Sequence, residues 1–323
     1  MLYRQLGKSD LNVSAVAMGT WAIGGMWWGG TDEQDAIAAI NAGLDAGISI
    51  IDTAPMYGYG LSEEIVGKAI AGRSRDEIVL ATKCGLDWDT GEGEFFFTLP
   101  EGPVHKNLRP DNIRREVELS LKRLGTDYLD LYQTHWQDTT TPIADSMGAL
   151  LELQQQGKIR AIGVSNATTE QMDEYLAVGR IDSTQPRYHM LDREIEADYL
   201  PYCLKHSIGV LSYSSLNLGL LTGTISPDRV FPESDQRSKN PLFKPEKIAQ
   251  VNEMLEQFAP FREKYNLTQT QLAIAWTISR PGVTVALVGV RNAAQAVDIA
   301  PGGGAAIDAD DLAAMDQILE TSL

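Results

Sequence analysis

Cysteine and basic side chains are scarce in this chain of 323 residues. The two cysteines, Cys84 and Cys203, are too few and too far apart for a disulfide framework. HExxH and CxxC patterns are also absent, so we expect no structural metal. The 27 lysines and arginines face 44 aspartates and glutamates, which gives a net charge of −17. This balance argues against binding to nucleic acid or an anionic membrane, because such proteins carry basic surfaces.

Long apolar runs are missing as well. No stretch approaches the ~18 apolar residues of a membrane-spanning helix, and residues 1–14 lack the apolar core of a signal peptide. We therefore expect a soluble cytoplasmic protein whose partners are small molecules. No segment of the sequence indicates an oligomer interface, so the oligomeric state stays open.

Short apolar segments alternate with longer amphipathic ones along the chain. The short segments are rich in Val, Ile or Leu or are bounded by Gly, Asn, Asp or Ser, which is typical of buried parallel strands. The expected strands are residues 15–19, 48–52, 78–83, 129–135, 159–165, 183–188, 208–214 and 284–289. The first three expected helices open at Thr31, at Ser62 acting as a cap, and at Pro110. The others cover residues 143–156, 168–177, 194–205, 247–265, 268–280, 292–299 and 308–319.

Eight units, each a strand followed by a helix, predict one α/β domain over residues 1–323. The predicted fold is a (β/α)8 TIM barrel with extra C-terminal helices. Residues 2–6 and 11–14 flank the turn Gly7-Lys8-Ser9-Asp10 and predict a β-hairpin that plugs the N-terminal end of the barrel. The alternative is a doubly wound sheet, which needs a GxGxxG turn after its first strand. The first strand here ends instead in Gly19-Thr20-Trp21.

Two connections are long, residues 86–108 after the third strand and residues 215–245 after the seventh. Loops of this length in a compact domain are usually functional or disordered. Both leave the C-terminal ends of strands, where the active sites of barrels lie. We therefore expect both loops to border the active site.

Four ionisable residues lie at or near strand ends. Asp52, Lys83 and His135 each close a predicted strand, and Tyr57 follows Asp52 by five positions. Each has an ordinary structural explanation when taken alone, such as a helix cap for Asp52 or a side chain that reaches solvent for Lys83. In a barrel, however, all four project into one pocket at the C-terminal face. Together they indicate an active site.

The four side chains suggest a proton-transfer reaction. A buried Lys83 ammonium beside Tyr57 is expected to lower the phenol pKa from ~10 toward the working pH. Asp52 would pair with Lys83 and hold it charged, and His135 would orient a bound carbonyl. Tyr57 then acts as general acid to the carbonyl oxygen. Because no activated Ser or Cys nucleophile is apparent, a hydride from a nicotinamide is the fitting partner at carbon.

The chain resembles the aldo-keto reductases over nearly its whole length. Asp52, Tyr57, Lys83 and His135 match the catalytic tetrad of that family in order and context. Residues 44–58 and 157–166 resemble two of its signatures, and Gly19-Thr20-Trp21 also fits. Within the family the chain is similar to bacterial reductases of the general-stress-protein and inositol-operon kind.

The resemblance implies a set of residues that bind a nicotinamide cofactor. Ser165, Asn166 and Gln185 correspond to residues that bind the carboxamide, and Tyr213 to a residue that stacks on the nicotinamide ring. The full implied set is Gly19, Thr20, Trp21, Asp52, Ser165, Asn166, Gln185, Tyr213, Ser214, Ser215, Leu216, Asn217, Gly219, Arg237, Gly289, Arg291, Gln295 and Asp298.

The cofactor implied by the resemblance is NADPH, with NADH as a possible substitute. Arg291 supports this choice, because a guanidinium can pair bidentately with the 2′-phosphate. Three positions depart from the family pattern: Asn292 replaces a basic residue, Ile299 an adenine-contacting Asn, and Leu218 an Arg of close relatives. Because of these departures, we expect weaker binding of NADPH.

Aromatic residues are expected to form the substrate wall. The predicted wall contains Trp21, Trp28, Tyr57, Trp88, His135 and Trp136, with Met26, Trp27 and Phe95 as further candidates. Aromatic side chains on several strand-end loops are typical of a ligand pocket. Such a wall accepts small, polyhydroxy or aryl aldehydes and does not choose among them.

The resulting expectation is a reversible NADPH-dependent reductase of aldehydes and ketones that needs no metal. A nucleotide-sensing regulatory subunit with vestigial activity is the alternative, since potassium-channel β subunits share the barrel and tetrad of this family. A Schiff-base lyase using Lys83 is a third reading, which the neighbouring Asp52 disfavours because that reaction needs an unpaired lysine.

Overall fold

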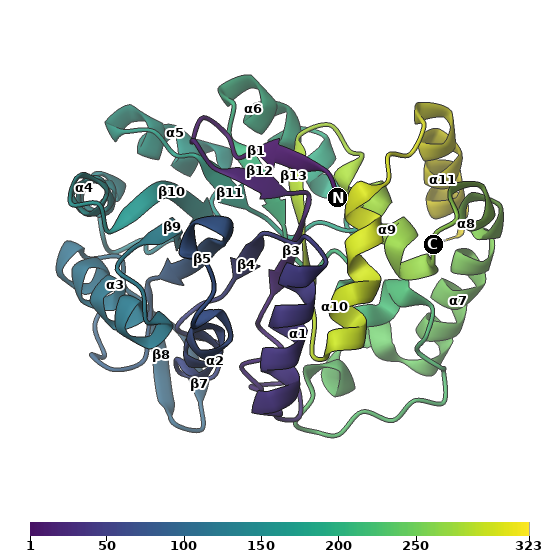
Figure 1. Cartoon of the computed structure of the whole chain (residues 1–323), viewed down its shortest axis with the longest axis horizontal. Helices are drawn as coiled ribbons and strands as arrows, with labels where there is room; N and C mark the ends of the chain where they lie inside the picture. Colours follow the sequence, from purple (N-terminus) through teal and green to yellow (C-terminus); the bar gives the residue numbers. More distant parts are fainter. Residues whose placement is uncertain (323) are drawn as a thin grey trace.

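A closed barrel of eight parallel strands forms the centre of the computed structural model, which describes residues 1–322. The predicted barrel is therefore confirmed (Figure 1). In order around the barrel, its strands are β3 (Val16–Gly19), β4 (Ile50–Asp52), β5 (Val79–Cys84), β9 (Leu129–Thr134), β10 (Ile159–Ser165), β11 (Ser183–Gln185), β12 (Gly209–Ser212) and β13 (Val283–Gly289).

Helices surround the barrel and bury the outward-facing apolar residues of its strands (Figure 1). They are α1 (Glu33–Asp45), α2 (Leu61–Ile70), α3 (Pro110–Leu124), α4 (Ile143–Gln155), α5 (Thr169–Val178), α6 (Tyr199–His206), α9 (Gln269–Ile278) and α10 (Ala293–Ile299). Three more, α7 (Pro245–Glu256), α8 (Ala259–Tyr265) and α11 (Ala309–Ser322), gather on the right of Figure 1. Among residues 1–322, no helix combines the length and apolar character needed to cross a membrane.

The predicted hairpin closes the N-terminal end of the barrel. Strands β1 (Tyr3–Gln5) and β2 (Asn12–Ser14) pair antiparallel. Leu6 and Leu11 are buried in one cluster with inward-facing barrel residues. Gly7 has a φ of 57°, and a Cβ there would lie 2.0 Å from the carbonyl oxygen of Asp182. This turn therefore needs glycine, both for its left-handed backbone and for the close approach to the barrel.

Proline accounts for two differences from the expected helices. The helix expected over residues 247–265 is divided into α7 and α8, because Pro260 lacks the N–H that would continue the helix. The helix expected over residues 194–205 begins only at Tyr199, which leaves Pro201 in the first turn, where proline is tolerated.

Ser62 is not the cap of α2, as the sequence had suggested. Gly60, with a φ of 95°, is the N-cap residue, and Ser62 is buried in the first helical turn. The Ser62 hydroxyl contacts Thr20 Oγ1 at 2.7 Å and Thr53 Oγ1 at 2.9 Å. Ser62 therefore joins α2 to the loops that follow β3 and β4.

Both long loops fold over the C-terminal mouth of the barrel. Residues 86–108 form a small antiparallel sheet of β6 (Leu86–Asp87), β8 (Gly102–Lys106) and β7 (Glu94–Leu99). Residues 215–245 contain three short 3-10 helices, η3 (Asn217–Thr222), η4 (Gln236–Lys239) and η5 (Pro241–Phe243). Residues from both loops line the same cavity.

Candidate active site

Lys83 lies at the centre of the predicted tetrad, at the end of β5. Its ammonium donates to Asp52 Oδ1 at 2.7 Å, to the carbonyl oxygen of Thr53 at 2.9 Å and to the Tyr57 hydroxyl at 3.2 Å. Lys83 is fully buried and Asp52 is 3 % exposed. An ion pair removed from water in this way needs close partners for both charges, and the three acceptors supply them for the ammonium.

The electrostatics of this group differ from the expectation in one respect. Burial is the largest single effect on Lys83 and lowers its pKa, but the charges and hydrogen bonds of Asp52 and Tyr57 together outweigh burial, so the Lys83 pKa lies above its ordinary value. Burial raises the pKa of Tyr57, and the nearby Lys83 only partly opposes this. The expected lowering of the Tyr57 pKa is therefore corrected, because the exclusion of water is the largest effect and Asp52 offsets part of the lysine charge. A phenol of raised pKa is a proton donor at neutral pH.

His135 is the third polar group beside Tyr57. Its ring meets the Tyr57 ring edge-on, with 5.8 Å between the centroids. Burial, with the charge of Lys83 as a smaller cause, holds the pKa of His135 well below its ordinary value. The imidazole is therefore neutral at pH 7. Its backbone is held from both sides, since His135 N–H donates to the Cys84 carbonyl at 2.8 Å and Asn166 Nδ2 donates to the His135 carbonyl at 3.0 Å.

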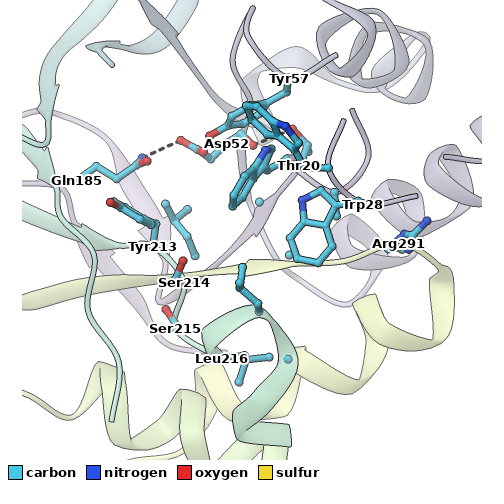
Figure 2. A pocket seen from close by; sticks show the side chains of 18 of the residues that line it. Thr20, Trp28, Asp52, Tyr57, Gln185, Tyr213, Ser214, Ser215, Leu216 and Arg291 are labelled. Atoms are coloured by element: carbon cyan, nitrogen blue, oxygen red, sulfur yellow. Dashed lines mark hydrogen bonds between the residues drawn. The ribbon is translucent and has the colours of Figure 1, made fainter. Parts of the chain in front are cut away.

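A cavity of about 780 Å³ opens above the tetrad and contains nearly all of the implied cofactor residues. Figure 2 shows Gln185 and Tyr213 on one side of it and Arg291 on the other. Its lining includes Gly19, Thr20, Trp21, Asp52, Ser165, Asn166, Gln185, Tyr213, Ser214, Ser215, Leu216, Gly219, Arg237, Gly289, Arg291, Gln295 and Asp298. Asn217 is the exception, because its side chain is buried away from the cavity.

The residues implied for the carboxamide are already tied to one another. Asn166, at a φ of 54°, accepts a hydrogen bond from the Tyr213 hydroxyl at 2.9 Å. Ser165 Oγ donates to the backbone carbonyl of Gln185 at 2.9 Å. Gln185 Nε2 in turn donates to Asp52 Oδ2 at 2.8 Å, a contact drawn in Figure 2. These bonds fix the wall of the cavity next to the tetrad.

The segment after β12 has an unusual backbone. Ser214, Asn217, Leu218 and Gly219 have φ values of 60°, 45°, 54° and 92°. The N–H groups of Asn217 and Gly219 bond the carbonyl oxygens of Ser214 and Leu216, so these left-handed residues close tight turns within the segment. Ser214, Leu218 and Gly219 line the cavity. The family resemblance is what assigns this segment to the pyrophosphate of a dinucleotide.

A strap formed by residues 27–30 and 235–237 borders the cavity, with Trp27, Trp28 and Arg237 in its lining. Trp28 and Asp235 form a β-bridge, and Gln236 N–H donates to the Trp27 carbonyl at 2.9 Å. Arg237 pairs with Asp235 at 2.6 Å and lies 5.1 Å from the Trp28 ring centroid. Arg291 Nη2 donates to the Gly30 carbonyl at 2.8 Å. The strap joins the loop after β3 to the loop after β12.

An aromatic arc of six rings borders the cavity. Successive centroid distances are 5.1 Å from Trp136 to Phe96, 5.0 Å to Phe97, 6.0 Å to Trp27, 6.2 Å to Trp21 and 5.6 Å to Trp28. All six residues, together with Met56, Leu86, Tyr57 and His135, line the cavity. The expected substrate wall did not include Met56, Leu86, Phe96 or Phe97, although the last three belong to the loop of residues 86–108 that was expected to border the site.

Two aromatic residues proposed for the wall lie elsewhere. Trp88 packs against Tyr59, with 5.4 Å between the ring centroids, and does not line the cavity. Trp88 packs instead against the small apolar cluster of Met56, Leu86, Leu99 and Val104. Phe95 is 59 % exposed on β7. A bulge in the pairing of β7 with β8 between residues 95 and 97 breaks the simple alternation, so both Phe96 and Phe97 reach the cavity.

Other ionisable groups do not extend the site. Burial raises the pKa of the Cys84 thiol well above its ordinary value, which makes it an unreactive buried thiol. His189 is nearly buried, and its Nδ1 accepts the Leu191 N–H at 3.1 Å. Within residues 1–322, no three or more His, Cys, Asp or Glu side chains are grouped in a way that could hold a metal ion.

Comparison with known proteins agrees with the geometry. Residues 15–320 match the model of the Aldo/keto reductase family. The chain is 41% identical to the aldo-keto reductase YhdN of Bacillus subtilis, covering 100% of this chain and 95% of the relative. It is 42% identical to an NADH-specific methylglyoxal reductase of Escherichia coli, with 88% of each chain covered.

Solved structures show the same likeness. The glycerol dehydrogenase AKR11B4 of Gluconobacter oxydans matches with a TM-score of 0.89 and 40% identity, over 99% of this chain and 96% of that one. The holo form of AKR11C1 from Bacillus halodurans matches with a TM-score of 0.79 and 30% identity, again over 99% and 96%. The chain therefore belongs to the aldo/keto reductase family and is an NAD(P)H-dependent oxidoreductase acting on carbonyl and alcohol groups.

Proposed function

We propose that this protein reduces aldehydes and ketones with NADPH, and that Tyr57 supplies the proton. The observation that carries this proposal is the Lys83 ammonium, which bridges Asp52 and Tyr57 at the floor of the cavity. A reduced nicotinamide bound there supplies a hydride to the carbonyl carbon. The remaining tasks fall to the residues of this chain.

Each residue of the tetrad has one task in the proposal. Tyr57 donates its hydroxyl proton to the carbonyl oxygen as negative charge develops there. Lys83 stabilises the phenolate that remains, and Asp52 keeps Lys83 charged and aimed. Neutral His135 orients the carbonyl oxygen. The aromatic arc excludes water and strengthens these interactions by lowering the local dielectric constant.

The preference for NADPH rests on Arg291, a cation at the far side of the cavity. Asn292 and Gln295 beside it are uncharged, and Asp298 is acidic, so we expect a modest preference of about tenfold over NADH. A relative is named for NADH specificity, so the cofactor preference of this chain needs to be measured directly. The measurement is kcat/KM with each cofactor, for the wild type and Arg291→Ala. A wild-type preference for NADH would overturn the choice of NADPH.

The first test of the proposal is cofactor oxidation with a panel of aldehydes. The panel includes methylglyoxal and glyceraldehyde, because relatives are named for methylglyoxal and glycerol, together with an aryl aldehyde for the aromatic arc. Tyr57→Phe removes only the hydroxyl, and we expect kcat to fall by about a thousandfold with cofactor affinity unchanged. Tight NADPH binding without turnover in the wild type would favour a nucleotide-sensing subunit instead.

A further inference from the structure

Gln133 is a buried amide directly beneath the cavity. It lies on β9 (Leu129–Thr134), two residues before His135, which directly follows the strand, so the alternation of the strand directs both side chains to the same face. Gln133 is fully buried and is not part of the cavity lining. Neither the tetrad nor the implied cofactor set includes it.

Gln133 contacts two residues of the proposed machinery. Asp52 Oδ1 is bound by Lys83, while Asp52 Oδ2 accepts from Gln185 Nε2 at 2.8 Å and from Gln133 Nε2 at 3.3 Å. Gln185 Nε2 also donates to Gln133 Oε1 at 3.4 Å. The three side chains come from β4, β9 and β11 and form a closed triangle inside the barrel.

Strand β10 leaves room for this triangle. Gly163 lies between Gln133 of β9 and Ser183 of β11 in the strand register. A Cβ at Gly163 would approach Gln133 Cγ to 2.8 Å and Ser183 Oγ to 2.5 Å. The absence of a side chain at this position therefore lets Gln133 cross in front of β10 and reach Gln185.

The triangle determines which end of the Gln185 amide faces the cavity. An ionised carboxylate only accepts hydrogen bonds, so Gln185 must turn its NH2 group toward Asp52. The two N–H bonds of that group are then directed to Asp52 Oδ2 and Gln133 Oε1. Gln185 is left with its carbonyl oxygen for a ligand in the cavity. That oxygen can bind a donor and cannot bind an acceptor.

We propose that Gln133 is a positioning residue that, together with Asp52, fixes the orientation of the Gln185 amide. The cavity thereby selects a nicotinamide ring whose substituent carries an N–H. Through its bond to Asp52, Gln133 also fixes the position of the Lys83–Asp52 pair. This inference rests on the proposed function, because it assigns the carboxamide of the cofactor to Gln185. It predicts a preference for a cofactor with a carboxamide over one without an N–H at that position, which a purely structural role of Gln133 does not produce.

The experiment compares NADP⁺ with its 3-acetylpyridine analogue, in which an acetyl group without N–H replaces the carboxamide. Dissociation constants are measured by titration of intrinsic fluorescence, with no turnover required. The wild type is expected to bind NADP⁺ about tenfold more tightly than the analogue, the equivalent of one hydrogen bond. Gln133→Met removes the amide at nearly equal length. The Gln185 NH2 group keeps its bond to Asp52 but loses its second acceptor, so the amide plane can tilt about that bond and the preference is expected to fall below about threefold.

Kinetics give a second readout of the same variant. We expect kcat for aldehyde reduction to fall by about tenfold or more in Gln133→Met, since small displacements of positioned groups have large effects. Gln133→Leu provides a second variant if the methionine form folds poorly. The matched control is Asn112→Leu, which removes a buried amide of α3 that bonds the Asn107 carbonyl and Arg115, away from the cavity. The control is expected to keep the wild-type preference for NADP⁺ at a similar loss of thermal stability.

Two results would overturn the inference. One is an unchanged preference for NADP⁺ in a folded Gln133 variant, and the other is a wild type that turns over normally but does not distinguish the two cofactors. Failure of the proposed function has a different signature. In that case the wild type shows no reduction of any aldehyde, or Tyr57→Phe remains active, whatever the Gln133 variants do.

Discussion

At the scale of single residues, Lys83 connects the charged carboxylate of Asp52 to the Tyr57 hydroxyl, the proposed proton donor. Its ammonium has three acceptors, and the bond to Tyr57 is the longest of them at 3.2 Å. The Tyr57 phenol retains its proton in neutral solution because burial raises its pKa. The Tyr57 phenol is thus ready to donate its proton in aldehyde reduction, whereas the phenolate that alcohol oxidation needs is harder to form.

This arrangement predicts opposite pH dependences for the two directions of the reaction. Aldehyde reduction needs the protonated phenol, so its kcat/KM should be flat from about pH 6 to pH 9 with respect to this group. Alcohol oxidation needs the phenolate and should rise with pH across the same range. The check is a pair of pH profiles for wild type and Lys83→Met, in which we expect the rise for oxidation to move to still higher pH. A fall in reduction centred near neutral pH would contradict the assignment.

The residues of the tetrad could be predicted because three of them close strands, and strand ends converge in any parallel barrel. Gln133 could have been found by the same means, since it shares a face with His135 at a spacing of two. The direction of the Tyr57 pKa shift could not be predicted. It depends on how much water is excluded and on how far Asp52 cancels the charge of Lys83, and both are three-dimensional quantities.

At the scale of elements, the strands were predictable from apolar runs, while the loops depended on contacts distant in sequence. The side chains of residues 86–108 are placed by the small sheet of β6, β7 and β8, and the bulge in β7 directs Phe96 and Phe97 inward. No local pattern distinguishes Phe96 from Phe95. Helix bounds are harder to predict than helices, because Pro260 and Pro201 lack the N–H that a helix interior needs and so shift the ends of α7, α8 and α6.

The hairpin of β1 and β2 provides a test at this scale. Gly7→Ala combines a left-handed φ with a Cβ only 2.0 Å from a carbonyl oxygen, and we expect a loss of about 2–4 kcal/mol in the free energy of unfolding. Gly72→Ala is the matched control, because Gly72 has a φ of 81° but open space around its Cβ position. That variant should lose only about 1 kcal/mol. Chemical denaturation measures both. Equal losses would show that the contact with Asp182 is unimportant.

At the scale of the whole molecule, a buried carboxyl group makes stability depend on pH. Glu116 on α3 is 4 % exposed and accepts the Gly85 N–H at 2.6 Å. Burial raises its pKa from 4.5 to about 8. The folded protein therefore retains a proton that the unfolded chain loses. The contribution of this proton to stability is complete below about pH 4.5 and is lost as the pH rises through about 8.

Glu116→Gln imitates the protonated form at every pH. We expect the variant to match the wild type in thermal stability at about pH 5 and to exceed it at about pH 9, by an amount on the order of a few kcal/mol at most. Thermal unfolding at the two pH values provides the comparison. The same difference in Tm at both values would mean that Glu116 is ionised in the folded protein.

The aromatic arc also makes the protein optically informative. Of its six tryptophans, Trp21, Trp27, Trp28 and Trp136 border the cavity, whereas Trp88 and Trp276 lie outside it. The absorption of a reduced nicotinamide overlaps indole emission, so energy transfer from four of the six emitters would report occupancy. Filling and emptying of the cavity can therefore be followed in real time on the unlabelled chain.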